Sequence, residues 1–456
     1  MIKENDIINV VGVDYNSHGI GVAKYAGKTI FVTNLIIGEK AEIKITKVKR
    51  SFALGKVVRF LEMSPDRIKP IIPETIHLGG CQFTQLTYAK ELAHKKDKIE
   101  RALRVIGGHN LTVKQIIPAE KIYFYRNKTV LPLGETKSGK IISGLYRHRT
   151  HEIIAMNQTH LDHENTGKII EVIKQLITDF NYSVYDEKKH EGVFRKIMIR
   201  TSFTTGDVLL ILITNATKIE RIAEFSRELK DKLPELTGIV QNINTERTNV
   251  ILGKNDVLLY GRDYVEEVIN GITFRVSSKS FFQVNTAQAE ILYNRALELA
   301  NLSKNDVILD AYSGTGTLAL LAAEKVKKAI GVEIVAEAVS DARKNAQRNN
   351  IKNAVFYAQD VNEFMNKSLI VEQVDVIIVD PPRKGLNLSF VNSILENPVK
   401  KIIYISCNPA TLARDLAVLS EKYAVKVVEA VDMFPRTAHV ETIVILKLKE
   451  KQHQNS

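Results

Sequence analysis

A cysteine lies where an apolar strand runs into a helix, in the stretch Lys401 to Asp415. Cys407 follows an apolar run, and Asn408 and Pro409 behind it are residue types that commonly begin a helix. The positive end of a helix favours a thiolate over a thiol, so Cys407 is a candidate nucleophile. A free cysteine is more often a small buried side chain. The position at a strand end favours the nucleophile.

Two more candidate reactive residues precede the last apolar run of the chain, TIVILKL. His439 and Glu441 stand just before this run. A carboxylate at that place can act as a general base, although on local sequence alone an exposed strand end is the commoner fate. We favour Glu441 as the base that works with Cys407.

A glycine-rich turn follows the apolar strand Val307–Asp310. Gly314 and Gly316 allow the backbone to approach a ligand closely. Glu333 ends the next predicted strand, where a carboxylate can accept hydrogen bonds from ribose hydroxyls. The pairing of glycines and carboxylate predicts a nucleoside site.

The same turn argues against a dinucleotide. Leu320 or Leu321 stands near the place of the third glycine that close pyrophosphate packing requires. We therefore predict a methyl donor, S-adenosylmethionine. Asp380, in the run VDPPRKG, ends a further apolar strand at the sheet edge where ligands of such folds bind. A simple turn cap is the alternative for Asp380.

A thiolate beside a methyl donor is useful if the substrate is a pyrimidine. C5 of uracil is a poor nucleophile until a thiolate adds to C6, which makes C5 enolate-like. A base must then remove the C5 proton so that elimination can release the enzyme. Cys407 and Glu441 match these two roles.

Regular alternation of apolar strands and amphipathic helices begins near residue 276 and would position these groups. It predicts βαβ units and a doubly wound, Rossmann-like α/β domain over 276–456. Residues 61–275 mix strand-like and helix-like runs, including a basic amphipathic helix over Thr87–Val105, and predict a central α+β domain. Short strands divided by glycines predict a small OB-like β-barrel over 1–60.

The charge balance permits a polyanionic partner without requiring one. The 456 residues include 64 Lys and Arg against 52 Asp and Glu, a net charge of +12. The longest apolar run, Val208 to Ile213, is far too short to span a bilayer. The N-terminus has no secretory pattern, so we expect a cytoplasmic protein with no membrane partner. Two cysteines exclude a disulfide framework and any four-cysteine metal site.

Six stretches together resemble the RNA uracil-5-methyltransferase family, whose S-adenosylmethionine-dependent enzymes make 5-methyluridine in ribosomal and transfer RNA. They follow the family's order and span nearly the whole chain: Ser280–Asn285, Asp310–Gly316, Gly331–Glu333, Asp380–Arg383, Ser406–Pro409 and His439–Glu441. The resemblance implies a nucleophile at Cys407 and proton removal by Glu441. It also implies cofactor contacts from Gln283, Tyr312, Glu333 and Asp380.

The N-terminal segment resembles a TRAM domain, a small RNA-binding module. Ribosomal RNA members of the family often carry this domain and transfer RNA members commonly lack it. The expected partner and substrate is therefore 23S rRNA, with no obligate protein partner. The complete set of matching residues implies a 23S rRNA (uracil-C5)-methyltransferase.

The chain departs from the family at three places. Many ribosomal members hold a four-iron cluster on four cysteines, one run of which reads Cys-Gly-Gly-Cys, and here that run is Leu78-Gly-Gly-Cys81. No further cysteine occurs before Cys407, so we predict no iron–sulfur cluster and no metal. Ser313 replaces a frequent cysteine and Arg436 a frequent histidine. Neither substitution removes a catalytic role.

Four other interpretations compete with this one. A transfer RNA uracil-5-methyltransferase and a non-catalytic RNA-binding ribosome-assembly factor would share most of the features. An adenine-N6 methyltransferase would have an aromatic residue after the two prolines, where this chain has Arg383. A cytosine-C5 RNA methyltransferase usually has two working cysteines, and Cys81 lies far outside the catalytic domain.

Overall fold

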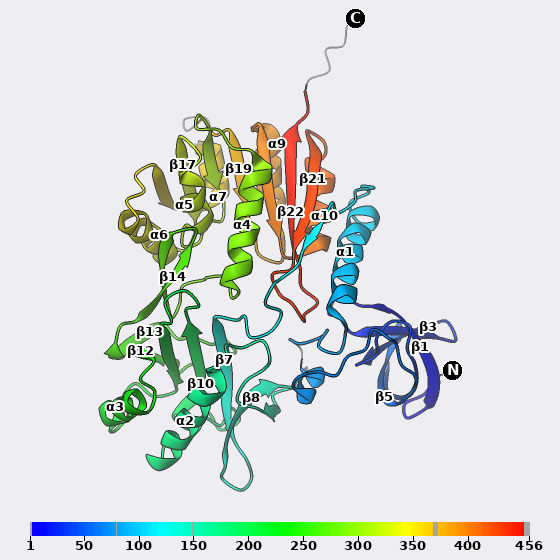
Figure 1. Ribbon diagram of the computed structural model, residues 1–456, viewed down its shortest axis with the longest axis vertical. Coiled ribbons are helices and arrows are strands. Elements are labelled where there is room, and N and C mark those ends of the chain that lie inside the picture. The colour runs from blue at the N-terminus through cyan, green and yellow to red at the C-terminus, as the bar shows by residue number, and fades with distance from the viewer. Residues whose placement is uncertain (1, 79, 148–149, 368–372, 451–456) are drawn as a thin grey trace, which may run out of the picture.

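The chain folds into three parts, with the C-terminal part at the top of Figure 1 and the other two side by side below it. The computed structural model describes residues 2–78, 80–147, 150–367 and 373–450. Gly79 of the Leu78-Gly-Gly-Cys81 run and the last six residues of the predicted catalytic domain lie outside the described residues. The domain bounds at 60/61 and 275/276 stay predictions.

Five short strands close into a barrel in the order β1-β2-β3-β5-β4. Their bounds are β1 (Ile7–Tyr15), β2 (Gly21–Tyr25), β3 (Lys28–Thr33), β4 (Lys40–Val48) and β5 (Phe52–Glu62). Alternate residues of β4, among them Ile43 and Ile45, point into the barrel and are fully buried. Gly21 is required for closure, because a Cβ there would lie 2.2 Å from the Leu35 carbonyl oxygen. The predicted N-terminal barrel is confirmed.

A seven-stranded sheet forms the middle part, in the order β13-β12-β11-β10-β7-β8-β9. Its strands are β7 (Lys128–Glu135), β8 (Ile141–Tyr146), β9 (Ile153–Ala155), β10 (Phe194–Thr201), β11 (Val208–Thr214), β12 (Leu236–Ile243) and β13 (Asn255–Gly261). Helices α2 (Thr166–Asp179) and α3 (Ile222–Lys232) pack on this sheet, and Ile173, Leu229 and Leu210 belong to one buried cluster. This part is the predicted central α+β domain.

The C-terminal part is built on an eight-stranded sheet in the order β18-β17-β16-β19-β20-β22-β21-β6. The first five of these strands are parallel, and β22 runs antiparallel between β20 and β21. The strands are β6 (Ile116–Ile117), β16 (Val307–Asp310), β17 (Lys328–Glu333), β18 (Ala354–Ala358), β19 (Val376–Val379), β20 (Lys401–Ser406), β21 (Tyr423–Val431) and β22 (Glu441–Leu448).

Helices cover both faces of this sheet, because every central strand is apolar on both sides. Ile308 of β16 faces one cluster and Leu309 the other. The first cluster includes helices α4 (Thr286–Ala300), α5 (Thr317–Ala323) and α6 (Ala336–Arg348). The second includes α1 (Tyr88–Val105), α7 (Val361–Lys367), α9 (Leu388–Glu396) and α10 (Pro409–Leu419). The predicted doubly wound Rossmann-like α/β domain is confirmed.

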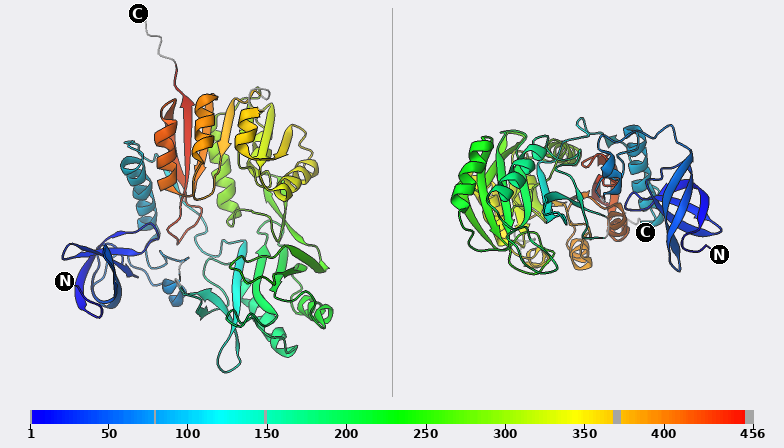
Figure 2. Two further views of the ribbon diagram at one scale, coloured as in Figure 1. Left: turned by 180° about the vertical axis from the view of Figure 1, so that it is seen from behind. Right: turned by 90° about the horizontal axis from the view of Figure 1, so that it is seen from below.

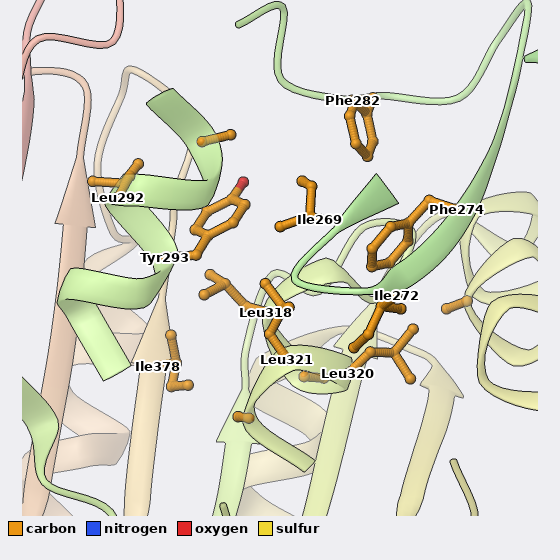
Figure 3. Packing of buried hydrophobic residues seen from close by; sticks show 14 of the residues in the cluster. Ile269, Ile272, Phe274, Phe282, Leu292, Tyr293, Leu318, Leu320, Leu321 and Ile378 are labelled. Atoms are coloured by element: carbon orange, nitrogen blue, oxygen red, sulfur yellow. The ribbon is translucent and has the colours of Figure 1, made fainter. Parts of the chain in front are cut away.

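The hairpin of β14 (Tyr264–Ile269) and β15 (Ile272–Ser277) joins the central part to this domain. Figure 3 shows Ile269, Ile272 and Phe274 from the hairpin facing Tyr293 of α4 and three leucines of α5. Leu209 and Ile211 of β11 belong to the same buried cluster. One continuous apolar core therefore spans the central sheet and the catalytic domain.

Helix α1 packs against the C-terminal domain, from which it is far apart in the sequence. The predicted helix over Thr87–Val105 is present, yet Ile99 and Leu103 pack against the catalytic domain, beside α10. β6 pairs with β21 at the edge of the same sheet. In both figures α1 stands between the barrel and the C-terminal sheet (Figures 1 and 2). A short 3-10 helix, η1 (Pro73–His77), precedes it. In the described part of the chain, no helix is both long and apolar enough to cross a membrane.

Candidate active site

A cavity of about 730 Å³ opens at the carboxyl ends of the parallel strands. All seven residues predicted for the site line it: Gln283, Tyr312, Gly314, Glu333, Asp380, Cys407 and Glu441. They come from segments up to 158 positions apart, between residues 283 and 441 (441 − 283 = 158). The topology therefore gathers every predicted residue at one place.

The glycine loop between β16 and α5 shapes one wall of the cavity. Gly316 has φ +85° and begins α5, and a Cβ there would lie 2.8 Å from the Phe356 ring. A Cβ at Gly314 would meet nothing within 4 Å, so the backbone is open toward the cavity there. The Gly314 and Val335 amides donate to the two carboxylate oxygens of Glu333, at 3.2 and 2.9 Å. These bonds fix the Glu333 carboxylate at the cavity edge.

Three carboxyl groups face the same space, of which Asp310 and Glu441 are buried and Asp380 is half-buried. Burial raises the pKa of Asp310 and of Asp380 to about 7, and the Asp380 charge adds to the rise at Asp310. Burial also raises the pKa of Glu441 well above its usual value, with Asp380 again contributing. Asp310 Oδ1 and Glu441 Oε2 have no hydrogen-bond partner among the described residues. A cavity walled by under-compensated acids fits a cationic ligand such as a sulfonium cofactor.

Cys407 lies between β20 and α10, as the sequence predicts. Asn408 caps α10 by accepting from the Ala410 amide at 3.2 Å, and Pro409 is the first helical residue. The expected thiolate stabilisation is not found, however. Burial, followed by the charges of Glu441 and Asp380, raises the pKa of Cys407 to about 12, and only the smaller opposing effects of Arg383 and a backbone hydrogen bond lower it. The helix end is outweighed first by burial of the thiol and then by the carboxyl groups that share its cavity.

Arg383 and His439 lie at the mouth of the cavity. The Arg383 guanidinium is 3.4 Å from His439 Nε2. The backbone carbonyl oxygen of Arg383 accepts a hydrogen bond from Asn408 Nδ2 at 2.9 Å. This second bond ties the Asp-Pro-Pro-Arg loop to the loop of Cys407. Burial, and then the charge of Arg383, lowers the pKa of His439 to about 4, so the imidazole is neutral at pH 7.

The Gln283 stretch is held from the central domain. Its carbonyl oxygen accepts from Asn127 Nδ2 at 2.9 Å, and the Asn127 amide donates to the Val284 carbonyl at 2.8 Å. The Gln283 side chain also hydrogen-bonds Tyr293 of α4. Tyr293 lies at ordinary helix spacing, and no chemical pattern in the sequence singles it out as a cavity residue.

The segment that carries His439 and Glu441 is held by α1 through buried charges. Four fully buried residues form the network: Glu91, Lys95, Asp432 and Arg436. Lys95 Nζ donates to Glu91 and to Asp432, both at 2.6 Å, and Arg436 Nη1 pairs with Glu91 at 3.0 Å. The amphipathic pattern of this helix does not single out Glu91 or Lys95. Only their partners, more than 330 positions away, show their role.

The region of the missing cysteines is apolar. Cys81 packs with Leu78, Tyr125 and Leu161, and burial raises its pKa to about 12. Among the residues that the structure describes, no group of three or more potential metal ligands occurs. The absence of an iron–sulfur cluster stays a prediction.

A family model for tRNA (uracil-5-)-methyltransferases matches residues 87–449, and a TRAM domain model matches residues 8–58. This chain belongs to the tRNA (uracil-5-)-methyltransferase family. It is an RNA methyltransferase that uses S-adenosylmethionine, as predicted, and its barrel is a TRAM domain.

Full-length relatives agree with this family. A Clostridium tetani protein named as an uncharacterized RNA methyltransferase is 40% identical, covering 98% of this chain and 97% of its own. A similar Clostridium acetobutylicum protein is 41% identical over 99% of both chains. A solved structure, the Pyrococcus abyssi tRNA (uracil-54, C5)-methyltransferase in complex with S-adenosyl-L-homocysteine, is 27% identical with a TM-score of 0.78. It covers 96% of this chain and 99% of its own.

Proposed function

We propose that this methyltransferase methylates C5 of a uridine in folded RNA through a covalent bond between Cys407 and C6. The observation that carries the proposal is that Cys407 and Glu441 line one cavity with the glycine loop and Asp380. S-adenosylmethionine supplies the methyl group when bound. The carboxyl groups of Asp310 and Asp380 match its positive charge, and the Glu333 carboxylate matches ribose hydroxyls.

The residues then divide the reaction into addition and elimination. The Cys407 thiol loses its proton to solvent and its sulfur adds to C6, which makes C5 a nucleophile that takes the methyl group and releases S-adenosylhomocysteine. Glu441 removes the C5 proton, the C5–C6 double bond forms again, and the C6–S bond breaks. Glu441 needs to be deprotonated for this step. Its position beside Asp380 makes that step sensitive to which of the two carries a proton.

The raised pKa of Cys407 assigns a further role to the neighbouring groups. A thiol with a pKa of about 12 is almost entirely protonated at pH 7. A cation bound against Asp380 and Glu441 would offset the two charges that oppose the thiolate. A filled cofactor site would therefore favour the thiolate form of Cys407 more than an empty one.

The RNA substrate has two candidates. We propose 23S rRNA first, because the chain carries the TRAM barrel that ribosomal members of the family often have. Transfer RNA is the second candidate, because the Pyrococcus abyssi enzyme acts on tRNA and aligns over 96% of this chain, a share too large to omit the barrel.

Methyl transfer from labelled S-adenosylmethionine to unmodified 23S rRNA and tRNA transcripts tests the proposal. We expect 5-methyluridine in the 23S transcript and none with Cys407→Ala. Label in tRNA alone would move the assignment to the second substrate. Full activity of the Cys407→Ala enzyme would remove Cys407 from the mechanism, and no label in either RNA would favour an assembly factor.

A further inference from the structure

A second cavity, of about 430 Å³, opens on the other side of Cys407. Its walls come from the β1–β2 turn of the barrel, from α1 and from the start of α10. Cys407, Arg383 and His439 line both this cavity and the catalytic one. The nucleophile therefore lies at the junction of two cavities, and a substrate over Cys407 can extend into the second.

Two cations face this cavity without a carboxylate partner. Lys98 Nζ donates to the carbonyl oxygens of Ala438 at 2.8 Å and Ser17 at 3.4 Å, both uncharged. Among the described residues, neither Lys98 nor Arg383 forms an ion pair with a carboxylate. Burial, with the nearby charges of Lys95 and Arg383, lowers the pKa of Lys98 to about 8. Two facing cations of this kind are complementary to an anion such as a phosphate.

The other titratable groups near these walls do not neutralise Lys98 and Arg383. Arg101 is paired with Asp14 and Asp97, so these three groups together carry one negative charge against the two positive charges of Lys98 and Arg383. His94 is neutral at pH 7 because burial lowers its pKa to about 4. The surplus charge of the cavity is therefore positive.

The opposite end of the cavity is apolar and open. Val105 and Ile106 end α1 with 73% and 50% of their surface exposed, although both are large aliphatic side chains. Tyr15 and His18 of the barrel turn line the same cavity. Aromatic and aliphatic side chains next to a cation are the surroundings in which an unpaired nucleobase stacks.

The barrel is fixed in place at this cavity. Arg101 of α1 pairs with Asp14 of the barrel, the Tyr15 and His94 rings lie 4.8 Å apart, and Lys98 reaches Ser17. Because Lys98 also holds the Ala438 carbonyl, one side chain joins the barrel turn to the segment that carries Glu441. The barrel turn thus contributes a wall to a site beside the nucleophile.

We propose that this cavity binds the nucleotide adjacent to the target uridine, with its phosphate between Lys98 and Arg383 and its base against Val105 and Ile106. The inference rests on the proposed function of the Cys407 site. A uridine must leave its base stack to reach a thiol inside a cavity, so the neighbouring nucleotide is unstacked too and needs a surface of its own. The enzyme would then recognise two consecutive nucleotides.

Two substitutions test the cavity. Val105→Glu places a carboxylate at the apolar end, and we expect it to raise the KM for RNA about tenfold and leave the KM for S-adenosylmethionine unchanged. Val250→Glu, at a site that is 64% exposed in the central domain, is the matched control. Lys98→Gln retains an N–H donor for the Ala438 carbonyl and removes the charge. It should reduce the slope of log Kd for RNA against log salt by about 0.7, and Lys232→Gln should not.

A fluorescent probe separates this inference from the proposed function. The chain has no tryptophan, so Val105→Trp introduces a single one. We expect its emission to change on binding of unmodified 23S rRNA or tRNA transcripts, and that of Val250→Trp to stay constant. Such a change without any 5-methyluridine would overturn the proposed function and retain the RNA site. Normal methylation with unchanged emission, RNA KM and salt slope would overturn the cavity and retain the function.

Discussion

Two groups of charged residues each include part of the segment 432–441, and they differ in whether their charges are compensated. Glu91, Lys95, Asp432 and Arg436 pair acid with base on the side of α1. Asp310, Asp380 and Glu441 gather acid with acid in the cavity. In the paired group the charges neutralise one another, and the ion pairs hold a backbone segment in place. The unpaired group stays short of positive charge, which marks the place where a cationic ligand belongs.

The unpaired group contains the residue with the largest expected effect. Glu441→Gln removes the base, so we expect turnover to fall at least about 1000-fold while the bond to Cys407 still forms. A covalent protein–RNA adduct should then accumulate on denaturing gels. Glu421→Gln, at an exposed acid, is the control. Normal turnover without adduct would show that another group is the base.

The paired group should instead show its effect in stability. Lys95→Met leaves Asp432 buried without its cation and Glu91 with Arg436 alone, and we expect a loss of about 3–5 kcal/mol in the free energy of unfolding. Denaturant melts of this variant and of Lys96→Met on the same helix provide the measurement. If both variants unfold alike, the network does not hold the segment and the comparison fails.

Asp380→Asn should have the opposite effect on stability, because it removes an unpaired charge from the cavity. The amide replaces an unpaired carboxylate of the cavity, so the free energy of unfolding should be unchanged or larger. The affinity for S-adenosylmethionine should fall about 10- to 100-fold. Isothermal titration and thermal melts of this variant, with Asp263→Asn at an exposed acid as the control, separate the two effects. A large loss of stability would place Asp380 with the structural charges.

The last prediction concerns the dependence of cofactor affinity on pH, which changes gradually over several pH units. Asp310 and Asp380 have their pKa raised from 3.8 to about 7 without ligand. Their contribution to stability is therefore fully present below about pH 4 and lost as the pH rises to about 7. Binding of a cation should reverse this, so affinity should rise up to about tenfold per pH unit for each proton released below pH 7. Titration in buffers of different ionisation heat counts those protons, and a pH-independent affinity would contradict the unpaired state of the cavity.

The helices and strands that surround the site could be predicted from the sequence because their patterns are local. The glycine loop, the Asp380 loop and the capped start of α10 each combine a strand end with turn residues within a few positions. Family resemblance added Gln283, whose link to Asn127 depends on a hydrogen bond across domains. The expected stabilisation of the Cys407 thiolate is not found, because its pKa depends on burial and on charges that distant segments bring to it.

The sequence by itself determined the family, the doubly wound domain and the N-terminal barrel, and it supplied the candidate residues for the chemistry, since each is written in residue types and short spacings. Only the tertiary structure decided where α1 packs, that Lys95 and Arg436 are buried, and that Cys407 opens into a second cavity beside the barrel. Burial and charge compensation arise from residues hundreds of positions apart, and no local pattern encodes that proximity.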